Sequence, residues 1–390
     1  MAGPTLAIEI AFASNPGDVP VWTDVTAYAQ AFTVRRGRQR RADRFQAGGA
    51  SVMLNNQDRR FEPEYGGAYY PNVLPMRRLR ISAVWDATTY RLFAGFIVSW
   101  PPAYARKSLA TVTVEAVDGF KVLAMKQINA TYSQELSSTR VGNIADSAGW
   151  PAADRDIDTG QSTVQAVTAV NAAALQQMQN AEEAESGRLF IAGDGDLTFL
   201  DRHSLLQAPY NTSQATFGPA AGELPYSSLT FRFDDAEIWN ELRYTRDGGT
   251  EQVATDATSQ TTYLTRTLTK TGMIQTSDAE VLSEAQYHLS QFLAPHLGIQ
   301  AIKLDPYRTT DLWPQVLGRD LAERVTVQFT PPGGGAEISQ EVLLEGISHD
   351  VAVGSKWLTQ WSLSAADTQN YWLLGDTVYS VLDTTTRLAY

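Results

Sequence analysis

The feature that most constrains the fold is a pattern of three β segments that occurs twice. The first copy reads RRLRISAVW, YRLFAGFIVSW and ATVTVEAVD, and the second, about 250 residues later, reads AERVTVQFT, QEVLLEGISHDV and WLTQWSLSAAD. In both copies a basic residue precedes an alternating strand, a glycine (Gly95 or Gly346) lies in the second strand, and the third ends on Ala-x-Asp. Alternation of period two indicates antiparallel strands with one buried face.

The repeat predicts a duplicated β domain, with chance similarity of two β meanders as the alternative. A chain of 390 residues is too long for one core, because single cores rarely exceed roughly 250 to 300 residues. We expect an α+β, predominantly β protein with an α+β insert between the two β domains. The expected divisions are 1–125 for the first β domain, 126–227 for the insert, 228–370 for the second β domain and 371–390 for a C-terminal segment.

Helical patterns are confined to a few segments. The sequence predicts a short helix in TRVGNIADSAG and one long helix over residues 162–187, with Ser162 or Thr163 as its N-cap. A hairpin is expected in RLFIAGDGDLTFLDR. A further helix over residues 277–293 begins with a capping box formed by Ser277 and Glu280.

Residue usage excludes several kinds of chemistry. The chain has no cysteine, so disulfides, cysteine-ligated zinc and thiol catalysis are excluded, and its 4 histidines are widely spaced. No nucleophile elbow, zinc-protease motif or phosphate loop occurs. We therefore expect no catalytic residue, no metal site and no cofactor, although 43 acidic residues could always supply a glycosidase-like pair.

The charges are distributed unevenly. The net charge of −12 argues against general nucleic-acid binding, yet RRGRQRRADR concentrates positive charge in Arg35, Arg36, Arg38, Arg40, Arg41 and Arg44. This stretch is either a patch for nucleic acid or an acidic partner, or a strand and loop whose arginines pair with carboxylates within the chain or across subunits. We favour the second interpretation, because the planar guanidinium binds carboxylates bidentately.

A second cluster of polar residues follows a strand in LNNQDRRFEP, residues 54–63. Alternation in ASVML ends at two asparagines, and Asn55, Asn56 and Asp58 are residues that bond to their own backbone in turns. Phe61 is expected to re-enter the core, and Asp58 can hold Arg59, Arg60 or an arginine of a neighbouring subunit. We predict a turn and interface element here, and a catalytic role for Asp58 is the least favoured interpretation.

No apolar run approaches the roughly 20 residues that a membrane-spanning helix needs, and the N-terminus lacks the pattern of a secretion signal. We expect a soluble protein that is made in a cytoplasm and does not span a membrane.

Several stretches resemble the minor tail, or tail hub, proteins of long-tailed bacteriophages, especially those of actinobacteria. They are WTDVTAYAQAFTVRRGRQRRADRFQAGGASVMLNNQDRRFEP, YYPNVLPMRRLRI, LFAGFI, FLDR, NELRYTRDGG, LGIQAIKLDP, LEGISHDV and YWLLGDTVYSVLDTTTRLAY. The resemblance implies a structural, non-enzymatic virion protein at the tail tip, similar to a baseplate hub. In such hubs two tube-like antiparallel β domains per chain form a pseudo-hexameric ring as a homotrimer.

The same resemblance implies the neighbours: a six-fold tail tube, the distal tail protein, the tape measure protein, and other minor tail or fibre proteins. DNA is implied only in transit through the lumen, which a net acidic wall would repel. Two other functions remain open. One is a receptor- or glycan-binding tail module that uses Tyr65, Tyr69 and Tyr70, and the less favoured one is a cell-wall hydrolase with two carboxylates.

Overall fold

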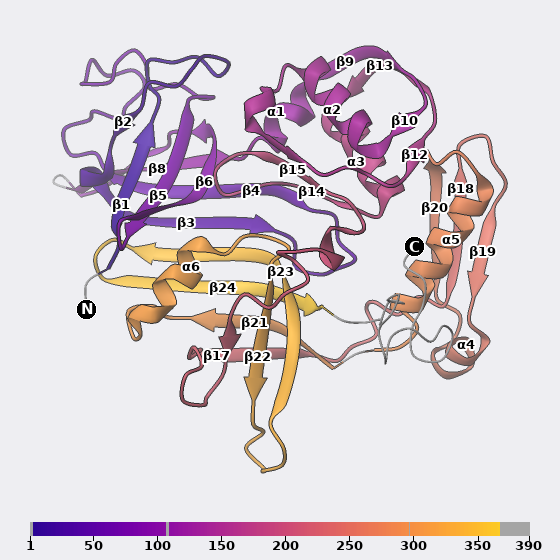
Figure 1. Ribbon diagram of the computed structural model, residues 1–390. Helices are drawn as coiled ribbons and strands as arrows, with labels where there is room; N and C mark the ends of the chain where they lie inside the picture. Colours follow the sequence, from indigo (N-terminus) through magenta and orange to yellow (C-terminus); the bar gives the residue numbers. More distant parts are fainter. Residues whose placement is uncertain (1–2, 107–108, 296, 367–390) are drawn as a thin grey trace.

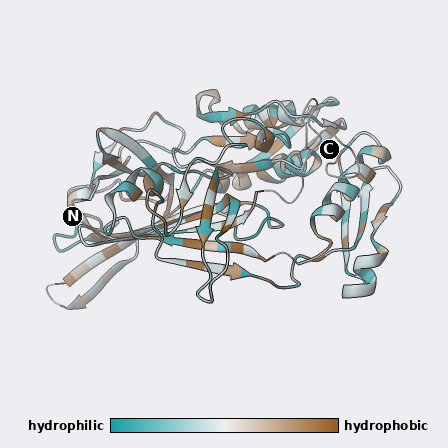
Figure 2. Cartoon of the chain, turned by 60° about the horizontal axis from the view of Figure 1, so that its bottom comes forward, coloured by the Kyte–Doolittle hydropathy of each residue, from teal (hydrophilic) through white to brown (hydrophobic). Residues whose placement is uncertain are grey.

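The computed structural model describes residues 3–106, 109–295 and 297–366. The protein is α+β and predominantly β, as the sequence predicts, and most strands belong to one 14-stranded sheet (Figure 1). Figure 2 shows apolar stretches along the strands of this sheet, which carries most of the main hydrophobic core. The predicted C-terminal segment, 371–390, lies outside the described residues.

The N-terminal half of the sheet forms a first repeat. Its strands are β1 (Thr5–Ile10), β3 (Ala29–Gly37), β4 (Gln46–Asn55), β5 (Arg78–Trp85), β6 (Thr88–Ser99) and β8 (Leu109–Val117). Two shorter strands, β2 (Thr23–Asp24) and β7 (Pro102–Arg106), pair with β1 and β8. The six main strands lie in the order β1-β5-β6-β8-β4-β3.

The C-terminal half forms a second repeat. Its strands are β16 (Thr216–Phe217), β17 (Ser228–Arg232), β21 (Gly298–Leu304), β22 (Arg324–Phe329), β23 (Ile338–Ala352) and β24 (Lys356–Ala365). They lie in the order β16-β22-β23-β24-β21-β17. When the strands of each repeat are numbered along the chain, both orders read 1-4-5-6-3-2. The duplication predicted from the sequence is therefore present, and it covers six strands instead of three.

Local irregularities also recur. Met76 and Ala322, which precede the fourth strand of each repeat, both have positive φ (64° and 69°). The pairing of the fifth and sixth strands is interrupted between Ile97 and Ser99 in the first repeat and between Leu344 and Gly346 in the second. One difference is that β1 pairs antiparallel with β5, whereas β16 pairs parallel with β22.

The structural register corrects part of the sequence alignment. Arg78 pairs with Phe96 and Arg324 pairs with Leu343, so the two fourth strands align with Leu79 equivalent to Val325. The same register makes Gly346 equivalent to Ser99, so Gly95 and Gly346 are not equivalent. The two Ala-x-Asp endings are not equivalent either, because Ala116 pairs with Ile97 whereas Leu363, not Ala365, pairs with the equivalent Leu344. Two glycines in similar apolar strands are a weaker guide than hydrogen-bond register.

The two repeats are joined by pairing between β3, the edge strand of the first repeat, and β23 of the second. Residues 31–37 of β3 pair antiparallel with residues 346–352 of β23, beyond the stretch of β23 that β22 occupies. The helix α6 (Trp313–Gly318), which belongs to the second repeat, packs against β5 and β6 of the first. The two halves thus share one sheet and one core.

Between the repeats lies a segment of mixed structure. Its elements are α1 (Phe120–Met125), β9 (Gln127–Tyr132), β10 (Glu135–Leu136), α2 (Ser137–Ala148), β11 (Arg155–Ile157), β12 (Thr163–Val164), β13 (Val167–Ala173), α3 (Ala174–Glu185), β14 (Arg188–Ile191) and β15 (Leu197–Leu200). The predicted short helix and hairpin are confirmed as α2 and the β14–β15 pair.

The predicted long helix over residues 162–187 is half wrong. Residues 167–173 form β13, which pairs antiparallel with β9, and the helix begins only at Ala174. Val164, Val167 and Val170 are β-branched residues, so pairing with a strand distant in sequence overrides the weak helical period. Ser162 is not an N-cap; its hydroxyl donates to the Ala184 carbonyl.

A small unit is inserted between β17 and β21. It comprises β18 (Glu241–Arg246), β19 (Gln252–Thr255), α4 (Ala257–Tyr263), β20 (Thr267–Met273) and α5 (Asp278–Gln291) and has a core of its own, built around Leu242, Tyr244 and Val281. The predicted capping box is confirmed: Ser277 Oγ accepts from the Glu280 N–H, and the Glu280 carboxylate accepts from the Ser277 N–H. Among the described residues, no helix is long and apolar enough to cross a membrane.

Candidate functional site

The turn after β4 is fixed by the two asparagines of LNNQDRRFEP. Asn55 Oδ1 accepts from the Gln57 N–H (3.0 Å), which makes the turn that the sequence predicts. Asn56 is fully buried, and its Oδ1 accepts from the Phe61 N–H (3.0 Å). The side chain of Asn56 therefore closes the loop across five residues and sets where the chain re-enters the core.

The charged residues of this turn pair with one another. Asp58 accepts from Arg60 Nε (2.6 Å), and Arg60 also lies over the Tyr28 ring. The hydrogen bond from Arg60 lowers the pKa of Asp58. Arg59, which has a positive φ of 63°, bonds to Glu62 (2.9 Å) and lies over the Tyr65 ring. Asp58 is thus held by an arginine as part of a turn.

Phe61 re-enters the core as predicted and is fully buried among aromatic rings. Its ring centroid lies 5.4 Å from that of Tyr69 and 6.5 Å from those of Phe12 and Trp100. The tyrosines of the alternative glycan-binding interpretation differ in exposure. Tyr65 and Tyr70 are exposed, whereas Tyr69 is half-buried and stacks on Phe12 at 4.2 Å, so they do not form one exposed platform.

The arginine-rich stretch occupies β3 and the loop to β4. Arg35 is exposed, but Arg36 is buried and pairs with Asp320 (2.7 Å), which precedes β22. The other Asp320 oxygen accepts from the Gly193 N–H (3.0 Å). Arg36 therefore ties the first repeat to the second and, through Asp320, to the segment between them.

Glu345 lies at the centre of the junction where the two repeats and the segment between them meet. It is fully buried in β23 and binds Arg38 (2.7 Å), Arg188 (3.1 Å) and the Ser364 hydroxyl (2.6 Å). Burial alone would raise the pKa of Glu345, but the two guanidinium groups outweigh burial and hold it well below its usual value. Glu345 is therefore ionised and forms ion pairs with both arginines.

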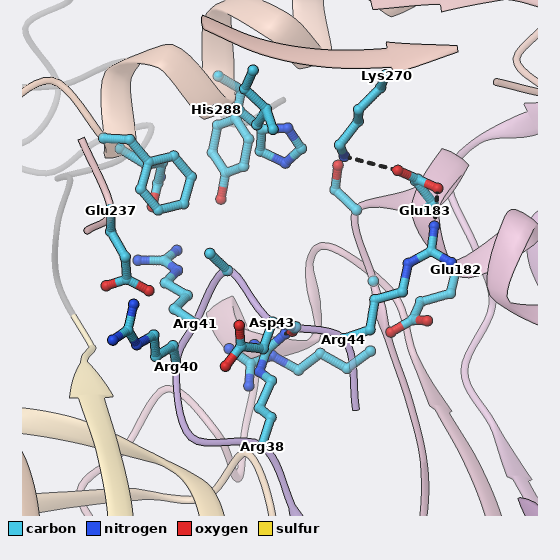
Figure 3. A pocket seen from close by; sticks show the side chains of 18 of the residues that line it. Arg38, Arg40, Arg41, Asp43, Arg44, Glu182, Glu183, Glu237, Lys270 and His288 are labelled. Carbon is cyan, nitrogen blue, oxygen red and sulfur yellow. Dashed lines mark hydrogen bonds and ion pairs between the residues drawn. The ribbon is translucent and has the colours of Figure 1, made fainter. Parts of the chain in front are cut away.

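Arg40, Arg41 and Arg44 lie in the loop between β3 and β4. They line a cavity of about 440 Å³ between this loop, α3 and the small unit of β18–β20 and α5 (Figure 3). Glu183 on α3 binds Arg44 of the loop and Lys270 of β20, at 3.2 Å for the lysine. In Figure 3, Arg40 and Arg41 lie on the side of the cavity where Glu237 is found.

Two carboxylates beside this cavity have perturbed pKa values. Burial raises the pKa of Glu182 to about 7, although Glu182 accepts from the Leu189 N–H (3.0 Å) and faces Arg38 and Arg44. Burial also raises the pKa of Glu284 to about 7, against the opposing effect of Lys270. His288 bonds through Nδ1 to the Tyr244 hydroxyl (3.0 Å), and burial lowers its pKa well below the usual value.

Among residues 3–106, 109–295 and 297–366, no group of three or more acidic or histidine side chains is placed to hold a metal ion. The charged groups described above pair mainly with one another, and the pairs of Arg36, Arg38 and Arg188 connect different parts of the fold. Their evident chemical role is to fix the relative positions of the two repeats and the segment between them.

The residues that make this junction, Glu345, Asp320 and Arg188, were not predicted from the sequence. One signal was available for Glu345, because it is a single charge inside the apolar run VLLEGI, and a charge in a buried strand needs a partner. Nothing local identifies Arg188 or Asp320, which lie 157 and 284 residues from their partners.

No protein-family model matches this sequence, and no curated protein matches it. Among solved structures, the chain is similar to the tail protein from Neisseria meningitidis MC58, with a TM-score of 0.61 and 13% identity over 93% of this chain and 96% of that chain. It is also similar to the 43 kDa tail protein of prophage MuSo2 from Shewanella oneidensis, with a TM-score of 0.59 and 12% identity over 94% and 99% of the two chains.

A prophage tail protein from Listeria monocytogenes matches at a TM-score of 0.50 and 10% identity, over 92% of this chain and 94% of that chain. The protein therefore has a phage tail-protein fold, shared over nearly the whole of each chain.

Proposed function

We propose that this protein is a structural component of a bacteriophage tail, and specifically a hub or minor tail protein at the distal tail tip. Three copies form a ring of six similar β domains, which joins a six-fold tail tube to three-fold tip components. The proposed domains are those expected from the sequence, near 1–125 and 228–370, with β16 just before residue 228 also pairing into the second repeat. The phage is proposed to be of the actinobacterial type.

The observation that carries this proposal is the repeated strand order 1-4-5-6-3-2, with the two repeats fused into one sheet through β3 and β23. A chain with two like units is suited to matching a six-fold surface with three copies. The tail-protein fold supports the same proposal. No further function is needed to account for the buried ion pairs, which hold together the two repeats and the segment between them.

The proposed neighbours are the tail tube, the distal tail protein, the tape measure protein, and other minor tail or fibre proteins. DNA passes through the lumen without binding, since a net charge of −12 gives a wall that repels phosphate. A lumen lined chiefly by residues 35–44 would contradict this part of the proposal.

The test of position uses virions. Antibodies against the chain, applied to particles from the phage that encodes it, are expected to label the distal end of the tail only. Label along the whole tail, label on side fibres, or virions that lack the protein would overturn the proposal. Side-fibre label would favour the receptor-binding alternative.

The proposal includes the absence of enzymatic activity. Purified protein incubated with host cell wall is expected to release no soluble fragments. Reproducible release that a single Asp or Glu substitution abolishes would contradict the structural assignment and favour the hydrolase alternative.

A further inference from the structure

The contact between the two repeats occurs once within the chain, and the duplication implies where it can occur a second time. In the chain, β3 of the first repeat pairs with residues 346–352 of β23, the extension of the fifth strand beyond β22. Each repeat has an equivalent of both partners. The second repeat therefore has its own counterpart of β3, and the first repeat has its own counterpart of the β23 extension.

The counterpart of the β23 extension is the end of β6 together with β7. His349 pairs with Thr359 and Val351 with Trp357 in the second repeat, whereas Pro102 pairs with Val112 and Tyr104 with Ala110 in the first. Counting from the shared register of the fourth and fifth strands, residues 99–105 match residues 346–352. In the second repeat β3 pairs with this extension of β23. On the equivalent edge of β7, opposite the edge that pairs with β8, no strand of the described chain is paired.

The edge of β7 is available for pairing. Residues 101–105 are all exposed, with Tyr104 59% accessible. The Ala110 carbonyl accepts from the Asn56 N–H on its β4 side, so Ala110 and Tyr104 form a non-hydrogen-bonded pair and the Tyr104 N–H points away from β8. Pro102 has no N–H, which restricts new pairing to the part of β7 around residues 103–105.

The counterpart of β3 is β17. Phe32 of β3 pairs with Val52, and Leu229 of β17 pairs with Ile302 at the equivalent position of the third strand. β17 is the last strand at its end of the sheet and has no neighbour beyond it in the described chain (Figure 1). Phe231 and Phe233 beside this edge are 38% and 66% exposed, which is unusual for a free edge in a soluble protein.

We propose that β17 of one copy pairs antiparallel with β7 of the next copy and so repeats, between chains, the β3–β23 contact found within the chain. The occupant of both open edges is thus a second copy of this protein. Transferring the register of β3 and β23 places Leu229 opposite Tyr104 and Thr230 opposite Ala103. The contact is heterologous, so each added copy again presents one open edge of each kind, and three copies close the ring that this inference takes from the proposed function.

The same relation gives the LNNQDRRFEP turn a neighbour. Within the chain, the connection between the third and fourth strands of the second repeat contains α6 and lies on β5 and β6 of the first repeat. The equivalent connection of the first repeat is residues 56–77. In the ring it lies on β22 and β23 of the adjoining copy, and this places Asp58 and Arg59 at the interface predicted from the sequence.

Cysteine cross-linking tests the contact directly, because the native chain has no cysteine. Thr33 and Asp350, which pair directly, are the intrachain equivalents of Thr230 and Ala103. Three residues further along, the Val353 N–H donates to the Gln30 carbonyl, so that pair is hydrogen-bonded. Because the two kinds of pair alternate in antiparallel strands, Thr33 and Asp350 form a non-hydrogen-bonded pair. Side chains of such non-hydrogen-bonded pairs are close enough for a disulfide. The variant Ala103→Cys/Thr230→Cys is expected to form intermolecular disulfides on oxidation, up to a covalent trimer.

The matched control moves one cysteine to another exposed sheet edge. Ala103→Cys/Val253→Cys keeps the β7 cysteine and places the second on β19, where Val253 is 42% exposed. This control is expected to stay uncrosslinked under the same oxidation. Equal cross-linking of the two variants would overturn the assignment, because it would show random collision between exposed thiols.

Native mass spectrometry of the same samples over a concentration series separates the possible failures. Three copies with the specific cross-link support both the contact and the ring. Three copies without it overturn the contact and leave the proposed ring standing. Cross-linked chains that grow beyond three support the contact and overturn the ring. A monomer without cross-link at every concentration overturns the contact, while the labelling of virions still decides the tail function.

A second pair of variants tests the backbone hydrogen bond. Tyr104→Pro removes an N–H that β8 does not use, so the fold is retained and assembly is expected to be lost. Tyr104→Phe removes only the hydroxyl that contacts Glu62 and is expected to assemble like the native chain. Circular dichroism verifies the fold of both variants. Normal assembly of a folded Tyr104→Pro variant would overturn the proposed register.

Discussion

The two repeats have the same strand order but differ in the connection between their third and fourth strands. In the first repeat, residues 56–77 form a turn closed by Asn56 and anchored by Phe61, with exposed charges around Asp58. In the second repeat, residues 305–323 contain α6, whose Trp313 is fully buried between Trp85 of the first repeat and Trp357 of the second. The difference shows that the strands give both repeats the same architecture, whereas the connections between strands determine what each repeat contacts.

The strongest test of this difference is Trp313→Ala. Truncating a buried tryptophan costs about 3 to 5 kcal/mol, and here the loss also removes the packing of α6 on the first repeat, so we expect the upper end of that range. Urea unfolding measures the change. Trp313→Phe is the control. It keeps an aromatic ring and removes an indole N–H that has no hydrogen-bond partner in the described part of the chain, so its cost is expected to be much smaller. Equal losses would show that the contact is unimportant.

Glu345→Ala attacks the same junction through charge. It leaves Arg38 and Arg188 buried without their shared carboxylate, and breaking a buried pair in this way costs about 3 to 5 kcal/mol. Glu341→Ala is the control on the same strand, because the Glu341–Arg324 pair is more exposed and such pairs contribute about 1 kcal/mol or less. A loss of stability from Glu345→Ala no larger than that from Glu341→Ala would show that the Glu345 ion pairs do not stabilise the contact between the repeats.

These junction residues mark the limit of prediction from the sequence. The capping box of α5 was predictable because Ser277 and Glu280 act within one turn of chain. The β strands were predictable from alternation, and so was the re-entry of Phe61, since an apolar residue after a polar turn has few other destinations. β13 was missed because its partner, β9, lies some 40 residues away in the chain and local period does not report distant pairing.

The partners of the arginine-rich stretch, residues 35–44, could not be predicted from the sequence either. The sequence indicated that its arginines could pair with carboxylates but not which carboxylates, and Arg36 and Arg38 pair with Asp320 and Glu345, 284 and 307 residues away. A partner-facing role for the exposed Arg35 stays a prediction. Long-range partners of this kind follow from the packing of the repeats, which alternation alone does not specify.

Glu182 and Glu345 are both buried near the junction, but their pKa values shift in opposite directions. Unlike Glu345, Glu182 makes no short ion pair with an arginine among the described residues, and burial raises its pKa to about 7. The folded protein therefore binds a proton at Glu182 between pH 5 and 7 that the unfolded chain has released, so this group lowers stability as pH rises through that window. A shift from 4.5 to about 7 corresponds to a loss of roughly 3 kcal/mol.

The test is Glu182→Gln, which retains an oxygen to accept from the Leu189 N–H. Relative to the native chain, the variant is expected to gain stability at pH 8 and to gain little at pH 5. Comparing the two proteins at each pH cancels other groups that titrate. A difference between them that does not change from pH 5 to pH 8 would show that Glu182 is ionised throughout, like Glu345.

The smallest effect is expected in the first connection, from Asp58→Asn. The Asp58–Arg60 pair is partly exposed, with Asp58 52% accessible, so its removal should change the free energy of unfolding by less than about 1 kcal/mol. Because Arg60 lowers the pKa of Asp58, the contribution is present above the ordinary aspartate pKa and is lost as pH falls below it. Asp305→Asn is the matched control in the second connection, where Asp305 pairs with Arg308 at 3.1 Å.

Both substitutions are expected to be nearly silent in the isolated chain, because neither carboxylate is held in the core. They should differ once copies assemble, since residues 56–77 are proposed to lie on the adjoining copy whereas the second connection already lies on its own first repeat. Asp58→Asn is therefore expected to weaken trimer formation more than Asp305→Asn does, as measured by native mass spectrometry. Equal trimer formation by the two variants would leave Asp58 a turn residue with no part in the interface.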